Sequence, residues 1–201
     1  MNRTRKVLCV IMACVVMLFA TACGKDNTPF KHGTWSGNTY SSDFFGLKMQ
    51  FGSEWNTFSD ADVAKLNNIS SMSESSIQTV FDRGGSVYEM MAAKNNGSSI
   101  NITIQDADKS ISWSEKDFFN VGTSLIKSQY EAQGFNCSVE KSAVNFLGQN
   151  TDCLDISLSN GSQTLYCIMI PMFKSHYTAC ILFGSLSKPE LYTLVNMATP
   201  I

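Results

Sequence analysis

The chain carries few side chains that could perform catalytic chemistry. It has two histidines in 201 residues, His32 and His176. His32 lies in a stretch with proline, glycine and mixed charges, which indicates a solvated tether, and His176 lies in an expected surface turn between two strands. The sequence contains no G-x-S-x-G nucleophile elbow and no phosphate-binding glycine loop. We therefore expect no catalytic residues, no enzymatic activity and no cofactor.

One stretch has part of the spacing of a calcium-binding loop. Asp106, Asp108 and Ser110 alternate as the first ligands of such a loop do. The stretch lacks the glycine of the sixth position, where Ile111 stands, and the glutamate of the twelfth, where Asp117 stands. No C-x-x-C motif and no Cys/His pair at ligand spacing occurs. The local spacing therefore predicts no metal site.

Aromatic side chains are the remaining candidates for a binding surface. Trp113 precedes the longest expected helix, and an earlier cluster consists of Trp35, Tyr40, Phe44, Phe45 and Trp55. Core anchoring is the default interpretation. The alternative is an exposed groove for a peptide, a glycan or an apolar ligand, because Trp and Tyr are frequent at binding sites. Phe44 and Phe45 are adjacent and next to a turn, so both cannot easily point inward. We therefore predict that Phe44 and Phe45, together with Tyr40, form the binding contact.

The elements that would position these residues follow an export signal. Arg3, Arg5 and Lys6 precede an uninterrupted apolar run of 13 residues, 7–19, and the small residues 20–22 come next. A basic N-terminal region, a short apolar core and small residues before the cleavage site are typical of a secretory signal. An apolar run of 13 residues is too short to span a bilayer comfortably.

The end of this signal resembles the lipobox of bacterial lipoproteins. It reads Phe19-Ala20-Thr21-Ala22-Cys23-Gly24, with Ala20 where leucine is usual. The resemblance implies cleavage before Cys23, whose sulfur would carry a diacylglycerol that anchors the protein on the outer face of a bacterial cell membrane. The alternative is an ordinary cleaved signal with a coincidental cysteine. We expect a signal peptide over 1–22, an anchor and tether over 23–34, and a single domain over 35–201.

The charge of the mature chain excludes one class of partner. The signal holds three of the 15 Lys and Arg and none of the 17 Asp and Glu, so the remainder carries a net charge of −5. A mildly acidic chain does not favour nucleic acid, because phosphate binding needs a basic face. We therefore expect no nucleic-acid partner.

The domain retains four cysteines whose state the sequence leaves open. They are Cys137, Cys153, Cys167 and Cys180. An even number in an exported protein permits one or two disulfides, but free cysteine is also among the most buried residue types. A turn centred on Phe173-Lys174 would place Cys167 opposite Cys180 and permit a bridge, and a turn shifted by one residue would remove that pairing. We favour buried thiols and keep the Cys167–Cys180 disulfide as the alternative.

Periodicity and turn signals predict an α+β domain. Serines 59, 73, 114 and 187 are expected to cap four helices, the longest of which ends at Gly134. The long helix should bury a stripe made of Phe118, Phe119, Val121, Leu125, Ile126 and Tyr130. Strands are expected near Trp35–Ser41 and over 47–51, 87–94, 99–105, 137–146, 150–158, 164–172 and 177–183. The order favours an antiparallel sheet of about six to eight strands, with a C-terminal meander and helices on both faces.

This order resembles a known fold. The opening pattern that runs from Tyr40 through Gly46-Leu47 to Trp55, and the later Tyr88-x-Met90-x-Ala92, are similar to small lipoproteins of monoderm bacteria with a PsbP-like domain. That fold is shared by the photosystem protein PsbP and a Ran-binding nuclear import factor, and the resemblance covers residues 35–200. Members of this fold serve mainly as binding and assembly factors, but a fold does not fix a function.

Two hypotheses for the function follow. The first is a lipid-anchored extracytoplasmic protein whose domain binds another cell-surface protein and performs no chemistry. The second is a carrier that holds a small apolar ligand or a glycan in a pocket between the sheet and a helix.

Overall fold

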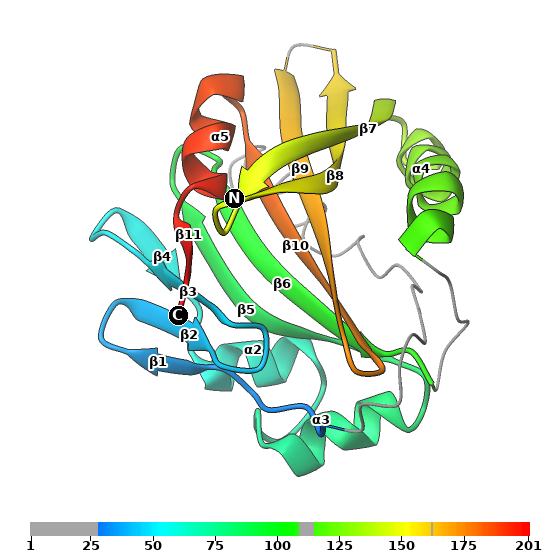
Figure 1. Ribbon diagram of the computed structural model, residues 1–201. Helices are drawn as coiled ribbons and strands as arrows, with labels where there is room; N and C mark the ends of the chain where they lie inside the picture. The colour runs from blue at the N-terminus through cyan, green and yellow to red at the C-terminus, as the bar shows by residue number, and fades with distance from the viewer. Residues whose placement is uncertain (1–27, 109–114, 162) are drawn as a thin grey trace.

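The largest element of the fold is an antiparallel sheet of seven strands in the order β4-β5-β6-β10-β9-β8-β7. It is seen in a computed structural model that describes residues 28–108, 115–161 and 163–201 (Figure 1). Its strands are β4 (Trp55–Thr57), β5 (Ser86–Lys94), β6 (Ser99–Asp106), β7 (Asn136–Phe146), β8 (Gln149–Asn160), β9 (Gln163–Lys174) and β10 (Tyr177–Ser185). The expected C-terminal meander is therefore present as β7 to β10.

A second, smaller sheet joins the two ends of the domain. Its order is β1-β2-β3-β11, and all of its pairs are antiparallel. The strands are β1 (Thr34–Ser36), β2 (Thr39–Ser42), β3 (Leu47–Gln50) and β11 (Ala198–Pro200). The sequence predicts one sheet, whereas the structure has two, because the C-terminal strand β11 pairs with β3 rather than with the meander.

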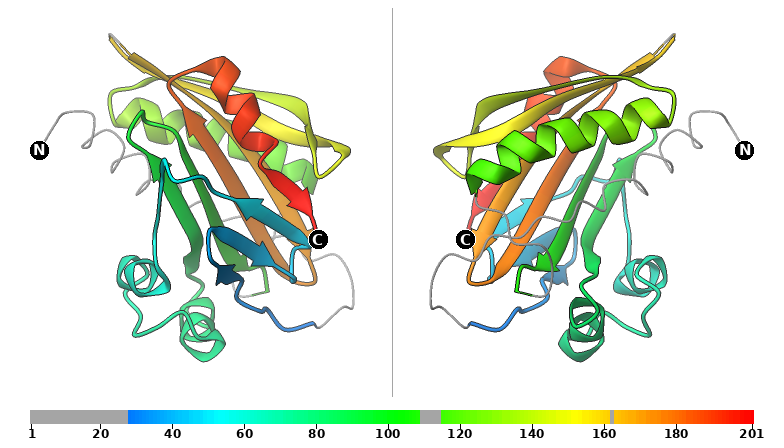
Figure 2. Two further views of the ribbon diagram at one scale, coloured as in Figure 1. Left: turned by 90° about the vertical axis from the view of Figure 1, so that its left-hand side faces the viewer. Right: turned by 90° about the vertical axis from the view of Figure 1, so that its right-hand side faces the viewer.

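Helices cover both faces of the large sheet, which confirms the predicted α+β class. They are α2 (Asp60–Leu66), α3 (Glu74–Phe81), α4 (Glu115–Ala132) and α5 (Lys188–Val195). Figure 2 shows α4 across one face, while α5 and the small sheet lie on the opposite side. The hydroxyls of Ser59, Ser73 and Ser187 accept backbone N–H groups in the first turns of α2, α3 and α5, as their capping positions predict.

Two apolar cores result from this layering. The larger core lies between the two sheets and includes side chains from α2, α3 and α5, such as Val63, Phe81 and Leu191. The smaller core lies beneath α4, where Phe118 and Ile126 pack against strands β7 to β10. No helix in the described part of the chain is long and apolar enough to cross a membrane.

The predicted buried stripe of α4 is wrong at two positions. Val121 and Leu125 are 40% and 48% exposed, whereas Phe118, Ile126 and Tyr130 are buried. Successive residues of an α-helix are about 100° apart, so the buried residues lie within an arc of about 120°. Val121 and Leu125 fall outside that arc, although their three- and four-residue spacing is helical. They form a small exposed apolar strip along one edge of the buried face of α4.

The cysteine pairing depends on the turn between β9 and β10. Tyr177 lies opposite Lys174, so the turn is centred two residues beyond Phe173-Lys174. In this register Cys180 lies opposite Pro171 and Cys167 lies opposite Gly184. This register contradicts the alternative of a Cys167–Cys180 disulfide, and both thiols are free and buried. Burial raises the pKa of each of the two to about 12.

Candidate functional site

The predicted binding contact is not on the surface. Phe44 and Phe45 are 4% and 8% exposed, and Tyr40 is fully buried. The two phenylalanine rings pack edge to face, with centroids 4.9 Å apart and an interplanar angle of 85°. Phe30 packs against Phe44 at a centroid distance of 5.4 Å. A residue of the expected tether therefore contributes to the burial of Phe44. The prediction of an exposed contact is therefore wrong, and the three rings are core.

The packed part of the chain begins before the expected boundary at residue 35. Phe30 is 5% exposed and also contacts Phe81 of α3 and Tyr177 of β10. Two residues later, His32 is fixed by acidic side chains rather than solvated as predicted. The sequence signal for this arrangement is weak, because an aromatic residue next to proline in a short polar stretch is also common in tethers.

A buried carboxylate organises this N-terminal segment. The side chain of Glu89 on β5 is fully buried and lies 2.8 Å from His32 Nδ1. Its Oε1 accepts the Gly33 N–H at 2.6 Å and the Tyr40 hydroxyl at 2.9 Å. On the other side of the imidazole, Asp60 Oδ1 lies 3.5 Å from Nε2. We call Glu89, His32, Tyr40 and Gly33 the Glu89 network.

The electrostatics of the Glu89 network favour a charged imidazole. Burial lowers the pKa of His32, but the hydrogen bond and charge of Glu89, with the charge of Asp60, outweigh it and raise the pKa above the ordinary value of 6.5. Burial and the nearby charge of Glu89 raise the pKa of Tyr40 well above 10.0. The Glu89 network attaches the segment before β1 to the large sheet. Because the Glu89 carboxylate is inaccessible and already binds three partners, it is not free to bind a substrate.

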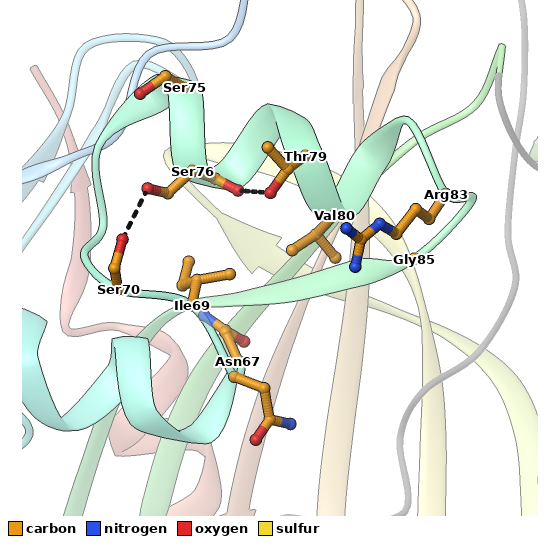
Figure 3. Close-up of a pocket in the computed structure, with 10 residues that line it drawn as sticks. Asn67, Ile69, Ser70, Ser75, Ser76, Thr79, Val80, Arg83 and Gly85 are labelled. Atoms are coloured by element: carbon orange, nitrogen blue, oxygen red, sulfur yellow. Dashed lines mark hydrogen bonds between the residues drawn. The ribbon is translucent and has the colours of Figure 1, made fainter.

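A polar pocket lies elsewhere, where α2 ends and α3 runs past the start of β5 (Figure 3). Its volume is about 590 Å³. The lining residues are Asn67, Asn68, Ile69, Ser70, Ser75, Ser76, Thr79, Val80, Arg83 and Gly85. Hydroxyl and amide groups therefore surround an apolar patch made by Ile69 and Val80, and Figure 3 shows the Arg83 guanidinium directed back toward Val80.

Local hydrogen bonds give the pocket a fixed wall. The Asn67 amide donates to the Tyr88 carbonyl at 2.8 Å, and its Oδ1 accepts the Tyr88 N–H at 2.8 Å, which clamps the end of α2 to β5. The Thr79 hydroxyl donates to the Ser76 carbonyl at 2.6 Å. Arg83 is exposed and takes part in none of the ion pairs found among the described residues. A free guanidinium beside several hydroxyls suits a ligand that carries hydroxyl or anionic oxygen groups.

A third group of polar residues gathers at the end of the large sheet. His176, in the turn after β9, lies 3.8 Å from Asp106 Oδ2 at the end of β6, measured from Nε2. Asp108 is close to both. Local spacing could not reveal this arrangement, because the imidazole comes from a strand connection 70 residues along the chain.

The described residues form an α+β domain with two antiparallel sheets, an inaccessible carboxylate network and a polar pocket. Neither a protein-family model nor a curated protein sequence matches the chain. Among solved structures, the chain is similar to the solution structure of cyanobacterial PsbP (CyanoP) from Synechocystis sp. PCC 6803, at 10% sequence identity and a TM-score of 0.48. The similarity covers 90% of this chain and 98% of that protein.

Proposed function

We propose that this chain is a lipid-anchored, extracytoplasmic, non-catalytic protein that binds a glycan or another hydroxyl-rich ligand in the pocket between α2 and α3. The chemistry of the pocket carries the proposal: hydroxyls, amides and one unpaired guanidinium surround a small apolar floor. A sugar presents the same combination, with hydroxyl groups on its rim and C–H groups on its faces. This supports the glycan form of the carrier hypothesis over its apolar-ligand form.

Two features support a binding role without catalysis. The Glu89 network joins the titratable side chains of Glu89, His32 and Tyr40, and the Glu89 side chain at its centre is fully buried. The pocket itself contains Arg83 but no histidine, cysteine or carboxylate among its lining residues. A pocket of this composition can orient a ligand by hydrogen bonds, but its described lining residues include no imidazole, thiol or carboxylate to serve as a general acid or base.

Binding to an array of neutral and carboxylate-bearing oligosaccharides tests the pocket. We expect carboxylate-bearing sugars to bind, and Arg83→Ala to weaken that binding about tenfold or more, because a charge-assisted hydrogen bond contributes about 1.5–3 kcal/mol. Lys48→Ala is the matched control, since Lys48 is an exposed cation on β3 outside the pocket. Equal loss in both variants, or no binding to any sugar, would exclude the pocket as a glycan site.

The lipid anchor has its own test. The resemblance of residues 19–24 to a lipobox supports it. Mass spectrometry of the protein extracted from its own membrane should find a mature chain that begins at Cys23 and carries the mass of a diacylglycerol. A Cys23→Ser variant should remain uncleaved or be released, and a wild-type chain without the lipid mass would refute the anchor.

Protein binding remains a second candidate, supported by one observation. Val121 and Leu125 present an exposed apolar strip along one edge of the buried face of α4, and i, i+4 residues are neighbours on a helix surface. Val121→Ser with Leu125→Ser should reduce capture of a stoichiometric partner from detergent-extracted membranes. Leu66→Ser is the control, because Leu66 is 48% exposed on α2, away from the strip. Unchanged capture would remove this candidate.

A further inference from the structure

The polar group at the end of the large sheet joins three potential metal ligands from two separate segments. Asp106 and Asp108 come from the end of β6, and His176 comes from the turn between β9 and β10. One ligand atom of each lies within 4.8 Å of the others. The pairing of β6 with β10, in which Tyr177 lies opposite Asp106, brings the two segments together.

The imidazole is held with one nitrogen facing the carboxylates. His176 Nδ1 lies 3.0 Å from the Ser175 hydroxyl, and Nε2 lies 3.8 Å from Asp106 Oδ2. The backbone is fixed as well, because the His176 carbonyl accepts the Ala107 N–H at 2.6 Å. A metal-binding histidine commonly has its second ring nitrogen hydrogen-bonded. The Ser175 hydroxyl can accept from Nδ1–H, and in that tautomer the Nε2 lone pair faces the carboxylates.

One face of the imidazole is covered, because the ring of Tyr177 packs on the His176 ring at a centroid distance of 4.0 Å. Asp106 is 3% exposed, whereas Asp108 is exposed and His176 is half-buried. The group therefore has one rigid buried ligand and two that an ion could reach from solvent.

We propose that Asp106, Asp108 and His176 form a binding site for a divalent transition-metal ion. One imidazole nitrogen with two carboxylate oxygens suits Zn²⁺ or Mn²⁺ better than Ca²⁺, which prefers six or more oxygen ligands. Two ligands about 2.1 Å from one tetrahedral ion lie about 3.4 Å apart. The observed separation of 3.8 Å between Nε2 and Oδ2 needs only a small closure, and the exposed Asp108 can supply the third ligand. Water would complete the coordination.

Titration of the purified full chain with Zn²⁺ alone, followed by calorimetry, tests the site. We expect saturable binding that weakens at least tenfold in His176→Gln and in Asp108→Asn. Asp82→Asn is the matched control, because it removes a nearby negative charge outside the ligand set and should change the affinity less than threefold. Circular dichroism shows whether each variant is folded, and Asp108→Asn changes an exposed side chain that the fold does not need.

A second measurement identifies the ligand directly. The chain has two histidines, so its imidazole proton signals are easily resolved by NMR. Low concentrations of Mn²⁺ should broaden the His176 signals before those of His32. Absence of saturable Zn²⁺ binding, equal affinity in wild type and both ligand variants, or equal broadening of the two histidines would overturn the proposal. None of these outcomes depends on the glycan pocket.

Discussion

Replacement of Glu89 should have the largest effect on stability of any single change to a polar side chain in this domain. In Glu89→Ala, the Gly33 N–H, the Tyr40 hydroxyl and the His32 ring lose their acceptor while they stay buried. Each unsatisfied buried donor costs about 1–3 kcal/mol, and loss of one partner of a buried ion pair costs about 3–5 kcal/mol. These effects overlap, so we expect the free energy of unfolding to fall by about 3–5 kcal/mol.

The conservative variant separates charge from hydrogen bonding. In Glu89→Gln, the amide oxygen can accept from Gly33 and Tyr40, and the amide nitrogen can face a neutral His32. We expect the free energy of unfolding to fall by about 1–2 kcal/mol, because only the charge assistance of the hydrogen bond to His32 is lost. Urea unfolding followed by circular dichroism measures both variants. The exposed Glu140→Ala on β7 is the control and should change the unfolding free energy by less than about 0.5 kcal/mol. A Glu89→Ala loss below about 1 kcal/mol would refute the account of the network.

Three further predictions concern pH, thiols and packing. The raised pKa of His32 means that its contribution to stability is complete below about pH 6.5 and is lost as the pH rises through the folded-state pKa. Urea midpoints of the wild type should therefore fall as the pH rises above 6.5, and this His32-dependent fall should shrink in Glu89→Gln. Burial raises the pKa of Cys167 and Cys180 to about 12, so a maleimide should label both only in denaturant, and labelling in the native state at pH 8 would contradict their burial. Phe30→Ala should reduce the unfolding free energy by about 3–5 kcal/mol, and a change below about 0.5 kcal/mol would show that residue 30 belongs to a mobile tether.

Features set by local sequence were predictable. Ser59, Ser73 and Ser187 start helices because a hydroxyl at the N-cap satisfies a backbone N–H within three residues. The alternation of Ile100, Ile102 and Ile104 places one face of β6 in the larger core, as the period of a strand requires. Such signals need no knowledge of the rest of the chain.

Features set by distant contacts were not predictable. Phe44 is buried against Phe30, which lies 14 residues earlier in the sequence, and Phe45 packs on Phe44; no local pattern marks Phe30 as core. The sequence around His32 predicts a solvated side chain, but in the fold it lies against Glu89, which is 57 residues away in the sequence. The polar pocket also depends on how α3 packs beside β5, which local periodicity does not specify.

If Cys23 carries the proposed lipid, the early start of the packed domain limits how far the domain can stand from a bilayer. Phe30 is the seventh residue after Cys23, so an anchor on Cys23 would allow at most about 25 Å between the lipid and the core. Phe30 packs against Phe81 of α3, and α3 also forms one wall of the polar pocket. With the proposed anchor on Cys23, α3 and the pocket wall that it forms would therefore stay close to the lipid surface.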